Sequence, residues 1–333
     1  MNQQRYYALD VFRGATVALM ILVNNPGSWA HIYSPLAHAS WHGCTPTDLV
    51  FPFFLFAVGN AMSFVMPKFQ KAGSNEFWLK ITKRTLLIFG IGLFLNWSPF
   101  VKWSDTGLVF KPWEMVRILG VLQRIAICYF FASIILYYGK TRIALFIGMM
   151  ILVIYWVLTY ALGAPGHPFS LSGYFGNSID QYILGIPHIY KGEGVPFDPE
   201  GLTSSLPAIV QVILGYLVGE YIQLKGKNYE MLAQLLLTGV LLVLVGYIWD
   251  FSFPINKKIW TSSYVLYTTG LAMVSLGMLI YLLEFKNVSK ICPDVKYLYD
   301  MISWDEWVSY PNFIKFSAET KLPYLAEDKH PST

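Results

Sequence analysis

Two histidines and a carboxylate lie close together, just ahead of a long apolar run. His38 and His42 precede Asp48 in the segment "LAHASWHGCTPTDLVFPFFLF", residues 36–56. An imidazole exchanges protons near neutral pH without large tuning, so histidines in such a setting suit general-base chemistry. A nearby carboxylate can orient the ring and raise its basicity. The pattern therefore predicts a histidine base held by Asp48.

Simpler interpretations of these residues stay open. Thr45, Pro46 and Asp48 have the types expected at the N-cap, first position and first turn of a helix, where a carboxylate complements the helix dipole. The two histidines would then be ordinary loop residues. Histidines four apart can share a metal ion on a helix, but Gly43 and Pro46 disfavour a helix and no third ligand follows. We therefore expect no metal site.

A further candidate is a charge inside an apolar segment. Arg124 falls about 12 Å inside its run, where a charge is costly and usually faces a partner, a cavity or a pathway. Asp10, Asp250 or the phosphates of an anionic ligand are the candidate partners. Two other polar clusters, "FDPEG" and "FPINKKIWTSSY", suit recognition of a hydroxyl-rich or amine-bearing substrate. Their candidate contacts are Asp198, Glu200, Asn256 and Trp260.

The elements that must position these residues are membrane helices. Of 333 residues, 55% are apolar and only 13% are charged, against about 25% charged in soluble domains. This composition predicts an all-α polytopic membrane protein, and the net charge of +4 gives no indication of nucleic-acid binding. Apolar runs long enough to cross a bilayer predict eight helices. The predicted spans are 8–26, 47–67, 83–99, 116–138, 143–164, 202–223, 230–250 and 263–285.

Lysine and arginine counts predict the orientation. With the N-terminus in the cytoplasm, twelve basic residues fall in cytoplasmic segments up to residue 286 and six in the opposite loops. Basic residues are retained in the cytoplasm, so this orientation is favoured and residues 36–46 face outward. The loop at 165–201 is expected to cap an outward site. We predict two regions, a membrane bundle over 1–285 and a polar cytoplasmic tail over 286–333.

Six motifs, in this order, resemble one known family. They are "LDVFRG", "VNN", "HASWHGCTPTDLVFPFF", "RILGVLQRIAICYF", "FDPEG" and "FPINKKIWTSSYV", and they cover residues 8 to about 285. The chain resembles the heparan-α-glucosaminide N-acetyltransferase family and its bacterial relatives. This resemblance implies an acyltransferase that moves acetyl from cytoplasmic acetyl-CoA across the membrane to the amine of an amino sugar or glycan.

The resemblance also implies roles for particular residues. His38 corresponds to the catalytic histidine, Asn24 to an amide in the same site and Asp48 to its acid. Whether His38 acts only as a base or briefly carries the acetyl group stays open, and we favour the base. Candidate contacts for acetyl-CoA are Arg124, Gln123, Lys83 and Arg84. Candidate contacts for the acceptor are Asp198, Glu200, Asn256, Trp260 and His42.

Departures from the family lead to further expectations. The large N-terminal region of the lysosomal enzyme is missing, which suggests a relative from the bacterial inner membrane. After residue 285 the family continues with hydrophobic helices where this chain has polar residues, so we expect a shortened bundle. The family suggests a homodimer. Two alternatives stay open, a transporter or flippase for a sugar or lipid-linked substrate, and a membrane scaffold without catalysis.

Overall fold

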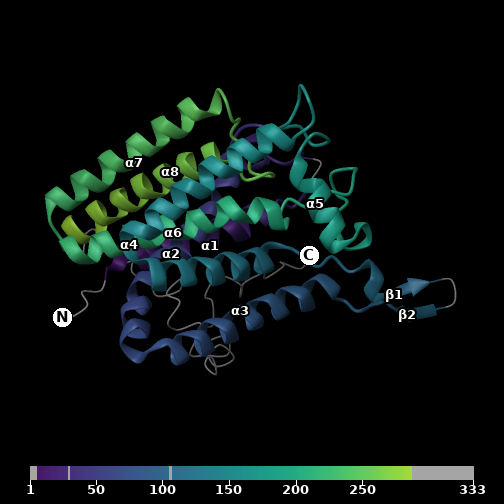
Figure 1. Ribbon diagram of the computed structural model, residues 1–333, viewed down its shortest axis with the longest axis horizontal. Coiled ribbons are helices and arrows are strands. Elements are labelled where there is room, and N and C mark those ends of the chain that lie inside the picture. The colour runs from purple at the N-terminus through teal and green to yellow at the C-terminus, as the bar shows by residue number, and fades with distance from the viewer. Residues whose placement is uncertain (1–5, 29–30, 105–106, 287–333) are drawn as a thin grey trace, which may run out of the picture.

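Long helices form the main body of the protein. The computed structural model describes residues 6–28, 31–104 and 107–286, so the predicted polar tail lies outside the described residues. The long helices run side by side along the longest axis of the molecule (Figure 1). They are α1 (Tyr7–Asn24), α2 (Val50–Ala72), α3 (Ser74–Trp97), α4 (Val121–Leu162), α6 (Leu202–Lys225), α7 (Tyr229–Asp250) and α8 (Ser262–Ile280).

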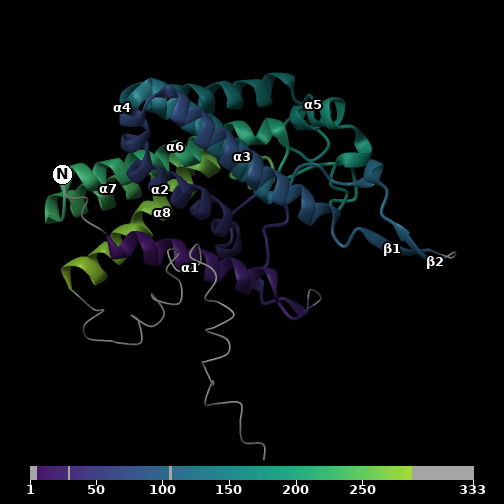
Figure 2. The ribbon, with the colours of Figure 1, turned by 90° about the horizontal axis from the view of Figure 1, so that it is seen from below.

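Short elements join the long helices. Helix α5 (Phe175–Leu184) lies in the long predicted loop, and the turn of π-helix η6 (Tyr281–Phe285) continues α8. Strands β1 (Val101–Ser104) and β2 (Gly107–Phe110) form an antiparallel hairpin. Both views place this hairpin beyond the end of the bundle where α5 lies (Figures 1 and 2). The 3₁₀-helices are η2 (Ser34–Leu36), η3 (Pro46–Leu49), η4 (Trp113–Met115) and η5 (Ile186–His188).

The predicted all-α membrane fold is confirmed. In the described part of the chain, six helices are long and apolar enough to cross a membrane. One of them, α4, has 42 residues and covers two predicted spans. Lys140 interrupts it with a φ of 53° and a ψ of −175°, at the position of the predicted connection. Helix α3 contains most of the predicted span 83–99 and ends at Trp97, but it is not among the six, because Lys80, Lys83 and Arg84 lie in it.

The core forms where α2 packs against α6. A Cβ added at Gly59 would lie 2.0 Å from the carbonyl oxygen of Val212, and one at Gly215 would lie 2.2 Å from that of Phe56. Only glycine permits such a close approach between two helix backbones, a common device in membrane bundles. Because α2 is fixed in this way, the residues before its first turn and after its last turn lie at opposite ends of the bundle.

Candidate active site

Each end of α2 borders a cavity. The first cavity, of about 330 Å³, is called here the histidine cavity. The second, of about 360 Å³, is called the basic cavity. A helix of 23 residues is roughly 34 Å long, comparable to the thickness of a bilayer's hydrocarbon core. The histidine cavity is lined by His38, Ala39, Trp41, Asp48, Arg117, Val121, Tyr190, Glu193, Pro199, Glu200, Lys257, Lys258 and Trp260.

A histidine and a carboxylate form the centre of the histidine cavity. Nδ1 of His38 lies 2.6 Å from Oδ1 of Asp48. The carboxylate is buried, whereas the His38 side chain is 47% exposed. Because Asp48 occupies Nδ1, the other ring nitrogen, Nε2, is the atom left for proton exchange with a substrate. The arrangement is that of an oriented general base.

The local sequence explains why Asp48 points toward the histidine loop. Thr45 is the N-cap of η3 and Pro46 its first residue, as predicted. Oδ2 of Asp48 accepts hydrogen bonds from the amides of Ala39 and Thr45, each at 3.0 Å, and from the Thr45 hydroxyl at 3.0 Å. Oδ1 stays available to His38. One carboxylate therefore caps the helix start and orients the imidazole, so the two interpretations hold together.

Lys257 is a member of this cluster that the sequence analysis did not single out. Its Nζ lies 3.3 Å from Oδ1 of Asp48 and 3.1 Å from Nδ1 of His38. It comes from the loop between α7 and α8, more than 200 residues away in the chain. The sequence signal was slight: Lys257 follows Asn256 inside a quoted motif, but a lysine in a loop ordinarily indicates only a solvated surface.

An arginine without a carboxylate partner lies beside the histidine cavity. Arg124 is fully buried, and its guanidinium carbon lies 5.0 Å from the centroid of the Trp260 ring, which lines the cavity. Its Nη2 donates to Ser204 and to the carbonyl of Gly201. Its Nε and Nη1 have no hydrogen-bond partner, nor does Nε1 of Trp260. Among the described residues, no carboxylate lies within 4.0 Å of Arg124, so neither Asp10 nor Asp250 is its counterion.

Such unpartnered donors indicate a ligand. A buried donor without an acceptor is costly, and a buried guanidinium without a counterion more so. Trp260 has a φ of 49°, which is unusual for a bulky residue and is often found at functional sites. Its backbone is held there by a turn in which Oδ1 of Asn256 accepts from the amide of Ile259 at 3.0 Å. The sequence analysis named Arg124 and Trp260 separately, and the fold brings them together.

The two acidic candidates differ in their surroundings. Asp198 is buried and accepts two hydrogen bonds from Arg117, at 2.9 and 2.6 Å, whereas Glu200 accepts one at 2.5 Å and lines the cavity. Burial alone would lower the pKa of Arg117, but its hydrogen bonds and ion pairs with both carboxylates raise that pKa above its usual value. Asp198 is thus committed to Arg117, and Glu200 is the carboxylate placed to meet a ligand.

Two residues predicted to contact the acceptor, His42 and Asn256, do not line the cavity. They connect two loops instead. His42 Nδ1 lies 3.4 Å from the side-chain nitrogen of Asn256, and the Gly43 amide donates to the carbonyl of Ile255 at 2.8 Å. Burial lowers the pKa of His42, partly offset by the charge of Asp250. These contacts fasten the loop that carries His38 to the loop that carries Lys257.

Two other polar side chains, Asn24 and Cys44, do not line the histidine cavity. The side chain of the predicted site residue Asn24 is exposed and donates to the carbonyl of Met20 in its own helix, at 2.9 Å. Burial raises the pKa of Cys44 to about 12, so this thiol is a poor nucleophile at neutral pH.

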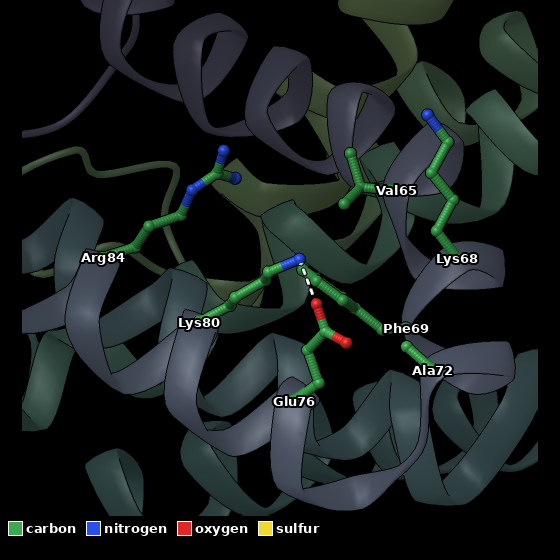
Figure 3. Close-up of a pocket in the computed structure, with 7 residues that line it drawn as sticks. All are labelled: Val65, Lys68, Phe69, Ala72, Glu76, Lys80 and Arg84. Atoms are coloured by element: carbon green, nitrogen blue, oxygen red, sulfur yellow. Dashed lines mark ion pairs between the residues drawn. The ribbon is translucent and has the colours of Figure 1, made fainter.

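The basic cavity lies at the turn between α2 and α3. Lys68, Lys80 and Arg84 surround it, together with Val65, Phe69, Ala72 and Glu76 (Figure 3). Glu76 pairs with Lys80 at 2.5 Å. Of the predicted phosphate contacts, Arg84 lines this cavity, and Lys83 is exposed on the same helix. Gln123 is buried against Gly92 of α3, with its side-chain nitrogen unpartnered.

Comparison with known proteins identifies the family. The family model described as "Heparan-alpha-glucosaminide N-acetyltransferase, catalytic" matches residues 5–246. This chain belongs to that family. It is 29% identical over 347 residues to the heparan-alpha-glucosaminide N-acetyltransferase of Homo sapiens, a match that covers 85% of this chain and 50% of the human protein. The corresponding protein of Mus musculus is 26% identical over 350 residues, covering 86% of this chain and 50% of the mouse protein.

The chain therefore spans about half the length of these curated relatives. The family match confirms the resemblance found in the sequence motifs. It also includes the loop of His38 and Asp48, Arg124 and the "FDPEG" segment. It ends before Lys257 and Trp260, which the fold brings to the same cavity.

Proposed function

We propose that this protein is a transmembrane acetyltransferase that moves an acetyl group from cytoplasmic acetyl-CoA to the amine of an extracytoplasmic amino sugar or glycan. The single observation that carries the proposal is the His38–Asp48 pair in a cavity that also adjoins unpartnered donors. Membership of a family named for an N-acetyltransferase supports the reaction class.

His38 is the general base in this proposal. The acceptor nitrogen attacks the carbonyl carbon of the thioester, forming the C–N bond as the C–S bond breaks. Nε2 of His38 takes the proton that the nitrogen loses and then returns it to the departing sulfur, which leaves as the free thiol. Asp48 holds the ring through Nδ1 and stabilises the imidazolium formed in this step.

Arg124 and Trp260 are assigned to the acetyl end of the donor. Acyl transfer builds negative charge on the carbonyl oxygen, and buried N–H donors aimed at that oxygen stabilise it. Nε and Nη1 of Arg124 and Nε1 of Trp260 are buried donors without a partner, and we assign them to this oxygen. Because Arg124 lies against a residue of the histidine cavity, we place it near the thioester and not at the distant phosphates.

The phosphates are assigned to the basic cavity at the other end of α2. Arg84 and Lys68 line this cavity, and Lys83 lies next to Arg84 on α3. This assignment requires the donor to extend along α2, about 27 Å from Lys68 to Val50, where the helix begins after the loop of His38. Gln123, buried between α3 and α4, is assigned to the path between the two cavities.

The acceptor is assigned to the loops around the histidine cavity. Glu200 supplies a carboxylate for the amine, and Trp260 forms part of the cavity lining next to the sugar. Asp198 holds Arg117, and His42 with Asn256 holds the loops, so these three shape the site. Asn24 keeps its predicted role in catalysis only if the end of α1 rearranges when substrates bind.

The membrane setting follows from the charges at the two ends. A basic cavity at one end of α2 suits the cytoplasmic side, where basic residues are retained and acetyl-CoA is made. We place the N-terminus in the cytoplasm and the protein in a bacterial inner membrane. A homodimer is the proposed assembly.

The test uses the full chain in liposomes, with acetyl-CoA labelled in the acetyl group on one side and a panel of amino sugars on the other. Transfer of label to a sugar is expected for the wild type, with a loss of about 100-fold or more in His38→Ala. His167→Ala is the matched control, because this exposed histidine lies in a loop outside the histidine cavity.

Each alternative has its own outcome. Sugar that enters the liposomes without carrying label would support the transporter. Full transfer by His38→Ala would contradict the role of the histidine. Transfer only when acetyl-CoA and sugar are on the same side would contradict reaction across the membrane.

A further inference from the structure

One cation lies against both members of the catalytic pair. Nζ of Lys257 is 3.1 Å from Nδ1 of His38 and 3.3 Å from Oδ1 of Asp48. Its side chain is 22% exposed. This geometry places a histidine, a carboxylate and a lysine within contact of one another, a cluster in which the proton on any member affects the other two.

The three groups cannot all form their preferred hydrogen bonds at once. Nδ1 of His38 either carries a proton and donates to Asp48, or presents a lone pair and accepts from Lys257. When the imidazole is protonated, both of its nitrogens are donors and Nδ1 faces a second cation at 3.1 Å. A charged Lys257 therefore disfavours the imidazolium and partly neutralises the carboxylate that favours it.

We propose that Lys257 is a positioning residue that keeps His38 uncharged between turnovers. This inference rests on the proposed function, because it assigns a role in the proton transfer to His38. Lys257 acts through His38 and Asp48 and is not assigned any contact with the reacting atoms.

The other charged groups around the cavity are paired with one another. Lys258 pairs with Glu193 at 2.6 Å and donates to the Ser40 carbonyl at 2.9 Å. Arg117 holds Asp198 and Glu200. His42 contacts Asn256 at 3.4 Å. Among the described residues, Lys257 and Asp48 are thus the two charged side chains that contact Nδ1 of His38.

Lys257 is also placed to lose its own proton more readily than most lysines. Burial lowers its pKa, while the negative charges of Asp48 and Glu200 oppose that change. Above this lowered pKa the lysine is neutral and no longer opposes protonation of His38. The balance within the cluster therefore changes at a pH below that at which an ordinary lysine titrates.

The experiment compares wild type, Lys257→Met, Lys257→Arg and Lys258→Met in detergent. Acetyl transfer is measured as a function of pH, and the titration of His38 is followed by NMR of ¹³C-labelled histidine, assigned with His38→Gln. Even at the dielectric constant of water, a unit charge about 3 Å away changes the pKa of a titrating group by about one unit. In Lys257→Met, the acid limb of the rate profile and the His38 midpoint are expected to move up by at least that amount.

The controls separate this role from a structural one. Lys257→Arg keeps the charge and is expected to keep the acid limb, and Lys258→Met, beside it in the chain, is expected to leave the His38 midpoint in place. An unchanged midpoint in Lys257→Met would overturn the inference, as would a rate lowered equally at every pH. If wild type transfers no acetyl group, the proposed function fails, while the NMR titration still decides whether Lys257 controls the charge of His38.

Discussion

Nδ1 of His38 lies 2.6 Å from Oδ1 of Asp48, and the second oxygen of that carboxylate is held by the backbone of the same loop. The imidazole is therefore held by a group that is itself fixed. Because Asp48 also lies in the turn η3 that leads into α2, His38 is attached to a helix that packs closely against α6. The position of His38 therefore depends on how the helices pack in the core.

Asp48→Asn tests that relationship. The amide keeps the size of the side chain, but it can no longer stabilise the imidazolium, and it can select the wrong tautomer of His38. We expect kcat for acetyl transfer to fall by about 100-fold, with a KM for acetyl-CoA within about twofold of wild type. Steady-state kinetics at saturating acceptor measure both. A rise in KM alone would mean that Asp48 serves binding.

Arg124→Met tests whether a buried charge is kept for function. The arginine has two unpartnered donors and no carboxylate within 4.0 Å among the described residues, so it contributes little to stability. We expect transfer to fall by about 100-fold, because the carbonyl oxygen loses its donor. The midpoint of thermal unfolding is expected to stay the same or rise.

Arg117→Met provides the contrast for that experiment. It leaves Asp198 and Glu200 without their cation, so its unfolding midpoint is expected to fall. A large loss of stability in Arg124→Met, equal to that of Arg117→Met, would show that Arg124 is part of the structural framework.

Asp198→Asn and Glu200→Gln test the different roles of the two acidic residues. The Asp198 side chain is fully buried on Arg117, so its neutralisation is expected to cost about 3 kcal/mol in the free energy of unfolding. Glu200→Gln leaves that bidentate pair intact and is expected to raise the KM for the acceptor with a smaller loss of stability. Thermal unfolding and acceptor titrations measure the two effects. This division of roles would be contradicted if both variants changed the KM for the acceptor and the free energy of unfolding by similar amounts.

Asp180 predicts a dependence of stability on pH. Burial raises its pKa to about 6, although two hydrogen bonds from Thr203 oppose the increase. Between about pH 4 and 6 the folded protein holds a proton that the unfolded chain releases, so stability falls as pH rises through this window. Relative to Asp180→Asn, which keeps an acceptor for Thr203, wild type is expected to lose up to about 3 kcal/mol.

Unfolding midpoints of both proteins, measured in detergent from pH 4 to 7, check this prediction. The difference between wild type and Asp180→Asn is expected to change below pH 6 and to stay constant above it. A constant difference over the whole range would show that Asp180 titrates normally.

The sequence allowed the membrane class and most helix positions to be predicted. Runs of apolar residues must be shielded from water, and their length is set by the bilayer. The interruption of α4 at Lys140 falls where the composition predicted a connection. The hairpin β1–β2 and the helix α5 were not predicted, because short elements outside the bilayer leave little periodic signal in a sequence.

The sequence alone predicted that Asp48 could cap a helix and hold a nearby histidine, because Thr45 and Pro46 mark a helix start close to His38 and His42; the structure shows that the histidine is His38. Only the tertiary structure decided that Lys257 contacts this pair, that Trp260 adjoins Arg124, and that Asp198 is committed to Arg117. Those partners come from distant segments, and their distances depend on how the helices pack. Helix packing depends on side-chain shape across the whole core, which no local pattern records.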